Sequence, residues 1–164
     1  MSRRRSALVL TALAASVVVI AGTATASAGH ASKASRTATT ATTFTVVERG
    51  VTDVYVYVNK SHNDVIGNKI GWGNKLYGPQ NKKKIGRDQG SCYRTNPGRS
   101  WECSWTNMLP GGQITVEGPF LDSGDDSKLS ITGGTGKYAT ASGYMLLHAR
   151  NKAGTAYDYE FHVM

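Results

Sequence analysis

The C-terminal segment TAYDYEFHV, residues 155–163, constrains the fold most strongly. Its apolar and polar residues occupy alternate positions, with Tyr157, Tyr159, Phe161 and Val163 in one set and Asp158, Glu160 and His162 in the other. Successive side chains of a β-strand point to opposite faces, so this alternation predicts a strand with one face buried and one face in water. Such strands are typical of antiparallel sheets.

Strand patterns separated by turn signals continue through the sequence from Phe44 onward, with almost no helical periodicity. About eight short strands with tight connections predict a sandwich or an up-and-down barrel. Closure into a barrel would also remove the exposed sheet edges. Segment 60–71 is polar and contains glycine, which predicts a loop. The strand candidates are segments 44–49, 51–58, 71–78, 85–95, 100–108, 112–120, 128–132, 143–150 and 155–163.

The N-terminal segment 1–28 has the pattern of a secretory signal peptide: three arginines, an apolar run from Ala7 to Gly22 and an Ala26-Ser27-Ala28 cleavage site. The alternative is a membrane anchor, but the apolar run is short for a spanning helix. We therefore expect export, cleavage and no stable membrane insertion. Segment 29–43 is rich in Ala, Ser and Thr and is predicted to be a flexible leader, which leaves 44–164 as one folded domain.

The net charge of the chain is +8, and it falls to +5 once the three arginines of the signal segment are removed. This moderate excess fits ordinary solubility, and the basic turn at 81–84 is predicted to be solvated, so we expect no nucleic-acid partner. Asp122, Asp125 and Asp126 lack the spacing of a calcium loop, and no cysteine or histidine spacing suggests zinc. We predict neither a metal nor a cofactor.

The two cysteines, Cys92 and Cys103, lie equally far from the pair Pro97-Gly98. If a hairpin turns there, the two residues face each other across neighbouring strands, and export favours their oxidation to a disulfide. The alternative left open is a free thiol that lines a pocket. The same register places Arg94 opposite Trp101, as a stacked cation–π pair, and Gly90 opposite Trp105.

The segment GGTGKY, residues 133–138, has the glycine content of a phosphate loop. It lacks the G-x-x-x-x-G-K-[ST] spacing and is followed by a strand pattern, so it does not predict nucleotide binding. We interpret Gly133, Gly134 and Gly136 as positive-φ positions of a tight connection between strands, with Tyr138 folded over it.

Five motifs in order give the chain a family resemblance. They are WGNKLYG, KKIGRDQGSC, GGQITVEGPFLD, LSITGGTGKY and ASGYMLLH, and the similar region runs from about Asp64 to the C-terminus. The chain resembles the allene oxide cyclase and dirigent protein superfamily, most closely its small secreted bacterial members. The resemblance implies an all-β fold, an eight-stranded antiparallel up-and-down barrel of the calycin type, which is often trimeric and has an apolar cavity. It also implies a small apolar or phenolic ligand whose cyclisation or stereoselective coupling the barrel steers.

The same resemblance implies the site residues. Asn74 and Cys92 match the pocket asparagine and cysteine of the cyclases. A direct alignment puts Thr45 at the catalytic glutamate of the first strand, and a shifted alignment puts Glu48 there. We take Glu48 and Asp88 as candidate acid/base residues.

Asn74 is expected to hydrogen-bond the ligand, and Trp105 is expected to form an apolar wall of the pocket. The activity implied is that of an isomerase, and the alternative is a non-catalytic ligand-binding or cell-envelope module. A cavity with an ionisable group beside Asn74 would favour catalysis, whereas a core filled by Trp and Tyr would leave no room for a substrate.

Overall fold

The computed structural model describes residues 41–164, so the predicted signal peptide and most of the predicted leader lie outside the described residues. These residues form β-strands and turns, and none of them belongs to a helix long and apolar enough to cross a membrane. The strands are β1 (Thr42–Arg49), β2 (Val54–Val56), β3 (Lys69–Trp72), β4 (Lys75–Tyr77), β5 (Lys84–Asn96), β6 (Ser100–Leu109), β7 (Gly112–Leu121), β8 (Ser127–Gly136), β9 (Gly143–Ala149) and β10 (Tyr157–Val163).

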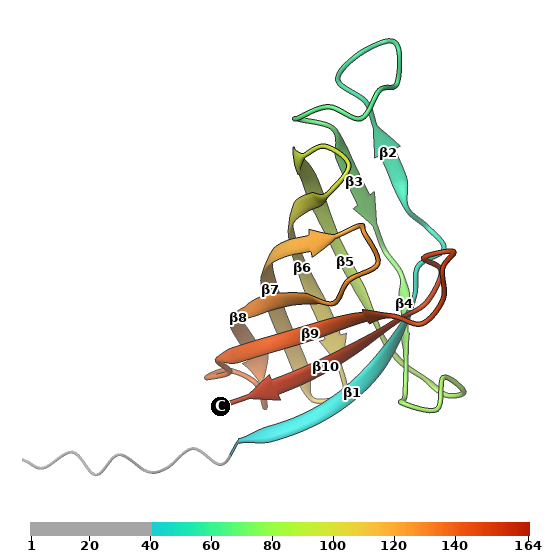
Figure 1. Ribbon diagram of the computed structural model, residues 1–164. Helices are drawn as coiled ribbons and strands as arrows, with labels where there is room; N and C mark the ends of the chain where they lie inside the picture. Colours follow the sequence, from blue (N-terminus) through green and yellow to red (C-terminus); the bar gives the residue numbers. More distant parts are fainter. Residues whose placement is uncertain (1–40) are drawn as a thin grey trace, which may run out of the picture. The chain divides into compact units, whose positions relative to one another are not determined.

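Eight of these strands close into an antiparallel barrel, as the sequence predicts (Figure 1). The ring runs β5-β4-β1-β10-β9-β8-β7-β6 and returns to β5 through the β5–β6 pairing. The first strand begins at Thr42, two residues before the expected start, because Thr42 pairs with Val163 of β10. Closure leaves no free edge within the ring and encloses one row of side chains from each strand.

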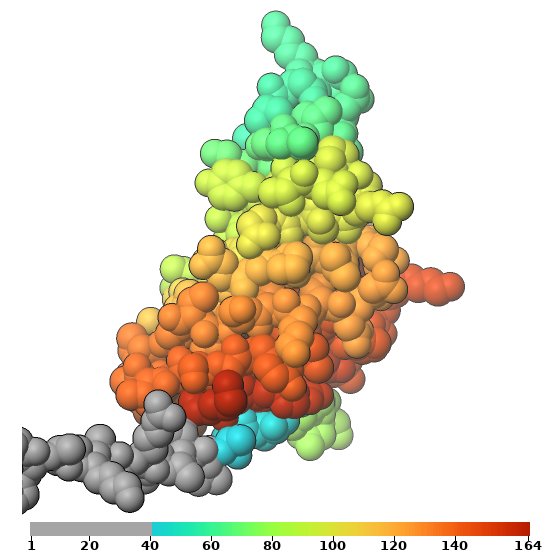
Figure 2. Space-filling view, turned by 60° about the vertical axis from the view of Figure 1, so that its left-hand side comes forward, coloured from blue at the N-terminus to red at the C-terminus, as the bar shows by residue number. Residues whose placement is uncertain are grey.

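The remaining strands, β2 and β3, form a two-stranded extension that projects beyond the ring (Figure 1). The extension exists because β5 is long: β4 pairs with its first part and β3 pairs with residues 90–93 farther along. Two sequence expectations fail here. The 51–58 segment is a strand only at Val54–Val56, and the predicted loop 60–71 contains the start of β3. All three residues of β2 are exposed, and Figure 2 shows this region standing apart from the barrel.

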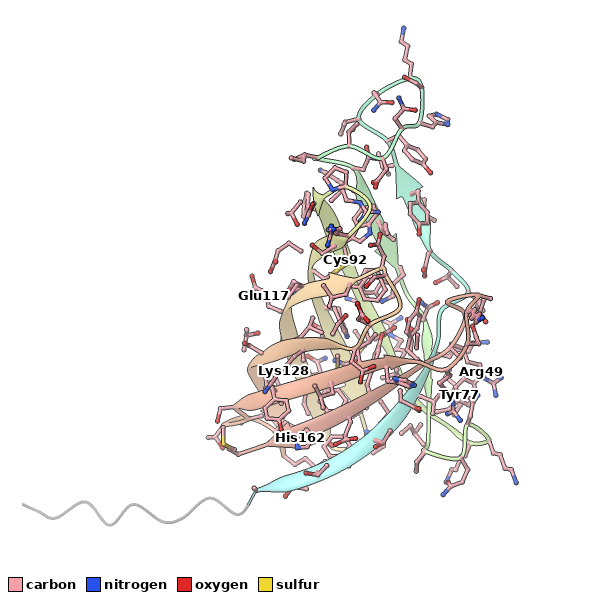
Figure 3. The ribbon with its side chains drawn as sticks, in the orientation of Figure 1. Arg49, Tyr77, Cys92, Glu117, Lys128 and His162 are labelled. Atoms are coloured by element: carbon pink, nitrogen blue, oxygen red, sulfur yellow. A yellow bond between two sulfur atoms is a disulfide. The ribbon has the colours of Figure 1, made fainter. Side chains whose placement is uncertain are left out.

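The barrel interior is filled by alternate residues of each strand, and in β10 the inward set includes Tyr159 and Phe161, as the alternation predicts. Phe44 stacks on Phe161 and on Tyr138 at the end of the barrel where β8 turns into β9. The outer surface carries solvated pairs, such as Arg49 over the Tyr77 ring at 3.8 Å (Figure 3). One end of the barrel is therefore closed by aromatic rings.

The three glycines of segment 133–138 were predicted to lie in the connection between two strands, and the structure places them in a strand instead. All three belong to β8, and the turn begins only after Gly136. Gly136 does adopt a left-handed backbone with φ of 60°. Gly134 does not have a positive φ; a Cβ on it would lie 2.3 Å from the carbonyl oxygen of Tyr138. Close backbone approach, rather than turn geometry, therefore explains this glycine.

The β5–β6 hairpin has the predicted register. Cys92 pairs with Cys103, Arg94 with Trp101 and Gly90 with Trp105. The turn occupies residues 97–99, longer than a two-residue connection, and a register shift between Arg94 and Asn96 absorbs the difference. The bulge keeps the inward-facing residues of β5 aligned with those of β6.

Candidate functional site

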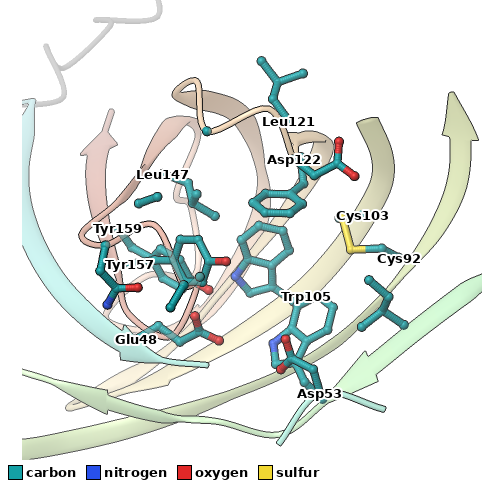
Figure 4. Close-up of a pocket in the computed structure, with 18 of the residues that line it drawn as sticks. Glu48, Asp53, Cys92, Cys103, Trp105, Leu121, Asp122, Leu147, Tyr157 and Tyr159 are labelled. Atoms are coloured by element: carbon teal, nitrogen blue, oxygen red, sulfur yellow. A yellow bond between two sulfur atoms is a disulfide. The ribbon is translucent and has the colours of Figure 1, made fainter. Parts of the chain in front are cut away.

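A cavity of about 320 Å³, shown in Figure 4, lies beside the β7–β8 and β9–β10 connections. Its floor is formed by side chains from the middle of β5, β6 and β10 and by the end of β1. Its rim is formed by residues 53 and 55, by the β7–β8 connection and by the β9–β10 connection. The volume is at the lower end of the range for small-molecule sites, so the barrel core leaves room for a ligand of modest size.

Glu48, near the end of β1, is the most informative residue of the cavity wall. Only 4% of its surface is exposed, and its carboxyl group lies beside Tyr157 and Tyr159 (Figure 4). Glu48 Oε1 accepts a hydrogen bond of 2.7 Å from Nδ2 of Asn74. An ionisable group thus lies at the cavity and beside Asn74, which is the arrangement that favours catalysis over passive binding.

The Asn74 amide is fixed in one orientation by its hydrogen bonds. Its Oδ1 accepts from the backbone N–H groups of Val51 and Thr52, both at 3.1 Å, and from the Thr52 hydroxyl at 2.8 Å. Its nitrogen therefore faces the carboxyls of Glu48 and Asp53. Asn74 is 1% exposed and does not line the cavity, so the structure places it behind Glu48 rather than against a ligand.

Asp88, on β5, lies on the same buried side of the barrel. Its Oδ1 accepts from the backbone N–H of Asn74 at 3.1 Å, and its Oδ2 accepts from the hydroxyl of Tyr159 at 3.3 Å. Asp88 is fully buried and is not part of the cavity wall. Tyr159 does line the cavity, so it connects the ligand space with the buried carboxyl.

The surroundings raise the pKa of both acids above their ordinary values. Burial raises the pKa of Glu48 to about 8, and the neighbouring carboxyls of Asp88 and Asp53 act in the same direction, partly offset by the Asn74 hydrogen bond. Burial also raises the pKa of Asp88 to about 6, against the hydrogen bonds from Asn74 and Tyr159. A carboxyl with a pKa near 8 is mostly protonated at neutral pH and can donate its proton to a ligand.

The apolar part of the wall is aromatic. Trp105 packs edge-on against Trp72 and at a tilt against Tyr159, with ring centroids 5.7 Å apart in both cases. Its neighbour across the strands is Gly90, and a Cβ there would lie 2.2 Å from the Cβ of Trp105. Because Gly90 has no side chain, Trp105 can pack directly on the backbone of β5.

The disulfide Cys92–Cys103 is present and lines the cavity (Figure 4). The predicted disulfide is confirmed. Cys92 also lines the cavity, as the alternative expected, but it does so as half of a disulfide and not as a free thiol. Within residues 41–164, no group of three or more His, Cys, Asp and Glu side chains is placed to hold a metal ion.

Of the residues singled out from the sequence, Glu48, Cys92 and Trp105 line the cavity, whereas Asn74 and Asp88 form the buried layer beneath it. Sequence reasoning missed Trp72, Tyr157 and Tyr159 as wall residues. The alternation of the last strand already placed both tyrosines on the inward face, so that signal was sufficient to find them.

Known proteins share the barrel fold. The model of the family described as "Dirigent-like protein" matches residues 15–164. A pyocyanin demethylase structure has a TM-score of 0.64 at 22% identity, over 75% of this chain and all of that one. A pterocarpan synthase dirigent protein has a TM-score of 0.62 at 17% identity, over 76% and 95% of the two chains.

A Diels-Alderase from Streptomyces koyangensis has a TM-score of 0.55 at 13% identity, over 78% and 68% of the two chains. At these identities the solved structures show a shared barrel fold. No curated protein sequence matches the chain.

Proposed function

Because the chain belongs to the dirigent-like protein family, we propose that it is an exported barrel that binds a small apolar or phenolic molecule and steers its cyclisation. The observation that carries the proposal is Glu48, a protonated acid held by Asn74 at the wall of an aromatic cavity. The similar barrels include a demethylase of pyocyanin, a pterocarpan synthase and a Diels-Alderase, and these names support a ring-forming or ring-bearing substrate.

The proposed chemistry is an intramolecular addition that needs no co-reactant. Glu48 donates its proton to a carbonyl oxygen of the bound ligand, a nucleophilic oxygen of the same ligand attacks the activated double bond, and the proton of that nucleophile returns to the Glu48 carboxylate. The product is an isomer of the substrate. The proton leaves from Oε2, because Oε1 already accepts the hydrogen bond from Asn74.

The cavity contributes by confinement. Its rings hold one folded conformation of the ligand and exclude water, which raises the rate of closure and selects one face of attack. Stereoselective coupling of phenoxy radicals is the second family activity, but it requires an external oxidant to form the radicals and gives Glu48 no proton to transfer. We therefore favour cyclisation.

The test uses a chalcone with a hydroxyl group ortho to its carbonyl, which closes slowly to racemic flavanone in water. The domain from residue 29 onward should give an enantiomeric excess of one flavanone, measured by chiral chromatography. Glu48→Gln keeps the hydrogen bond from Asn74 but lacks the proton, so it should lower the rate by about 100- to 10,000-fold. Wild-type activity should fall as pH rises through the pKa of Glu48, about 8.

Glu117→Gln, at an exposed position of β7, is the matched control and should leave the rate unchanged. Racemic flavanone formed at the uncatalysed rate, from a chalcone that demonstrably binds, would contradict the proposed cyclisation. It would support the alternative of a non-catalytic ligand-binding module.

A further inference from the structure

The indole N–H of Trp105 is a buried donor without an acceptor. Trp105 is 3% exposed, it lines the cavity, and its Nε1 has no hydrogen-bond partner among residues 41–164. Buried polar groups of native proteins nearly always have a partner, so each exception needs an explanation. An indole nitrogen can only donate, so the partner that fits it is an acceptor.

The other two tryptophans show that this donor is unusual. The Trp101 N–H donates to Asp122 at 3.1 Å, and Trp101 itself does not line the cavity. The Trp72 N–H makes no hydrogen bond of good geometry either, but it lies close enough to Asp88 to lower the pKa of that carboxyl. Both of these indoles therefore have a carboxyl group nearby, whereas the Trp105 N–H meets no acceptor among residues 41–164.

The position of Trp105 is also fixed by its surroundings. Trp105 packs so closely on Gly90 that no larger residue fits at position 90. The rings of Trp72 and Tyr159 contact the Trp105 indole. In the close-up of the cavity, Trp105 lies between Glu48 and the Cys92–Cys103 bond (Figure 4). A ring held in this way presents its N–H in one direction, which is what a specific ligand contact requires.

We propose that Trp105 determines specificity: its N–H binds a carbonyl oxygen carried on the ring system of the ligand, so the cavity selects ring ketones over ring hydrocarbons of the same shape. The inference rests on the proposed function, because it takes the cavity as the ligand site. It goes further by naming the chemical group that the ligand must carry. A ring hydrocarbon at that position would leave the indole N–H without an acceptor.

The experiment compares α-tetralone, a bicyclic ketone, with tetralin, which has the same two rings and no oxygen. Binding of each to the domain from residue 29 onward is measured by calorimetry. One hydrogen bond makes a modest net contribution, so wild type should bind the ketone about three- to tenfold more tightly than the hydrocarbon. Trp105→Phe keeps an aromatic ring but removes the donor, and this preference should disappear.

Trp101→Phe is the matched control, because it removes an indole N–H that already donates to Asp122 and belongs to a residue that does not line the cavity. It should keep the preference for the ketone. A second measurement on the wild-type protein does not depend on any variant folding. In nitrogen-edited NMR spectra, the Trp105 indole proton should move downfield with α-tetralone and stay in place with tetralin.

The outcomes separate the two proposals. If both compounds bind equally well to wild type, or if Trp105→Phe weakens both by the same factor, the specificity role is overturned and the ligand site stands. If neither compound binds, the cavity is not a site for ring compounds, and the proposed function fails together with this inference.

Discussion

Two buried clusters of ionisable side chains are centred on Asp88 and Arg94, six residues apart on β5, and they are built in opposite ways. At one end Asp88 lies beside Glu48, and the neighbouring groups that set the pKa of Glu48 are carboxyls, an amide and a tyrosine hydroxyl. At the other end Arg94 pairs with Asp64 and Asp122, each at 2.6 Å, and its guanidinium stacks 3.9 Å from the Trp101 ring. Arg94 is thus matched by two carboxylates, whereas no cation is paired with Glu48 or Asp88 in the described part of the chain.

This difference indicates a structural role for the Arg94 cluster and a functional role for the Glu48 cluster. A buried ion pair with good geometry ties elements together, and here Arg94 joins β5 to the loop before β3 and to the β7–β8 connection. Burial raises the pKa of both Glu48 and Asp88, and at neutral pH this reduces stability. Such groups are typical of functional sites, where a neutral acid in a dry cavity can transfer a proton.

The pH dependence of stability should show the largest difference between the two clusters, and Glu48 is its main source. The folded-state pKa of Glu48 is about 8, against 4.5 for the free group. The folded state therefore binds a proton that the unfolded chain has lost. Stability is highest below the unfolded pKa, falls as pH rises toward about 8, and is constant above it. The loss is on the order of 5 kcal/mol.

Glu48→Gln should remove most of this slope, so the variant should match wild type near pH 4 and exceed its stability near pH 8. Urea unfolding at several pH values measures both proteins. The smaller remaining slope should come from Asp88, whose pKa is raised in the same direction. If the stabilities of wild type and Glu48→Gln changed with pH in the same way, Glu48 would be ionised in the folded state at neutral pH. It would then not differ from Arg94 in being a buried group kept neutral.

The next largest effect concerns the matched cluster. Arg94→Met leaves Asp64 and Asp122 without their cation and should cost about 2–3 kcal/mol of stability, less than a fully buried pair because both carboxyls are partly exposed. The slope of stability against pH between 4.5 and 8 should not change, because the variant leaves Glu48 in place.

Arg150→Met provides the control, since Arg150 and Asp158 form a pair of 3.1 Å at the surface, with about a third of each side chain exposed. Its cost should stay below about 1 kcal/mol. Equal costs for the two variants would show that Arg94 is no better matched than a surface cation.

Much of the fold could be predicted from local patterns. The inward set of β10 follows from alternation alone, and the register of β5 and β6 follows from two cysteines equally far from one turn. The register also fixed Gly90 against Trp105 and Arg94 against Trp101. Each of these inferences depends on residues close in sequence, where the strand period determines which side chains face each other.

The remaining features depend on contacts between distant segments. Asn74 was expected to contact the ligand, yet Val51 and Thr52 occupy its oxygen and turn its nitrogen to Glu48. The pattern of 51–58 predicts a barrel strand, but β5 is long enough to pair with both β4 and β3, so this segment lies in the extension. The pKa of Glu48 is likewise set by burial and by carboxyls from other parts of the chain.

The smallest expected effect concerns Gly90, which lies on β5 between the two clusters. A Cβ there would lie 2.2 Å from the Cβ of Trp105 and 2.6 Å from the carbonyl oxygen of Ser104, so Gly90→Ala must displace β6 or the indole. Such overpacking should cost about 2 kcal/mol and change the near-ultraviolet circular dichroism of the tryptophans.

Gly98→Ala separates this steric effect from a backbone effect. Gly98 has a φ of 71° in the β5–β6 turn, and nothing lies within 4 Å of the added carbon. It should therefore cost only about 1 kcal/mol of backbone strain and leave the tryptophan signal unchanged. If Gly90→Ala also cost only about 1 kcal/mol and left the circular dichroism unchanged, Trp105 would not be held against β5. The part of β5 between the Glu48 cluster and the Arg94 cluster would then not be rigid.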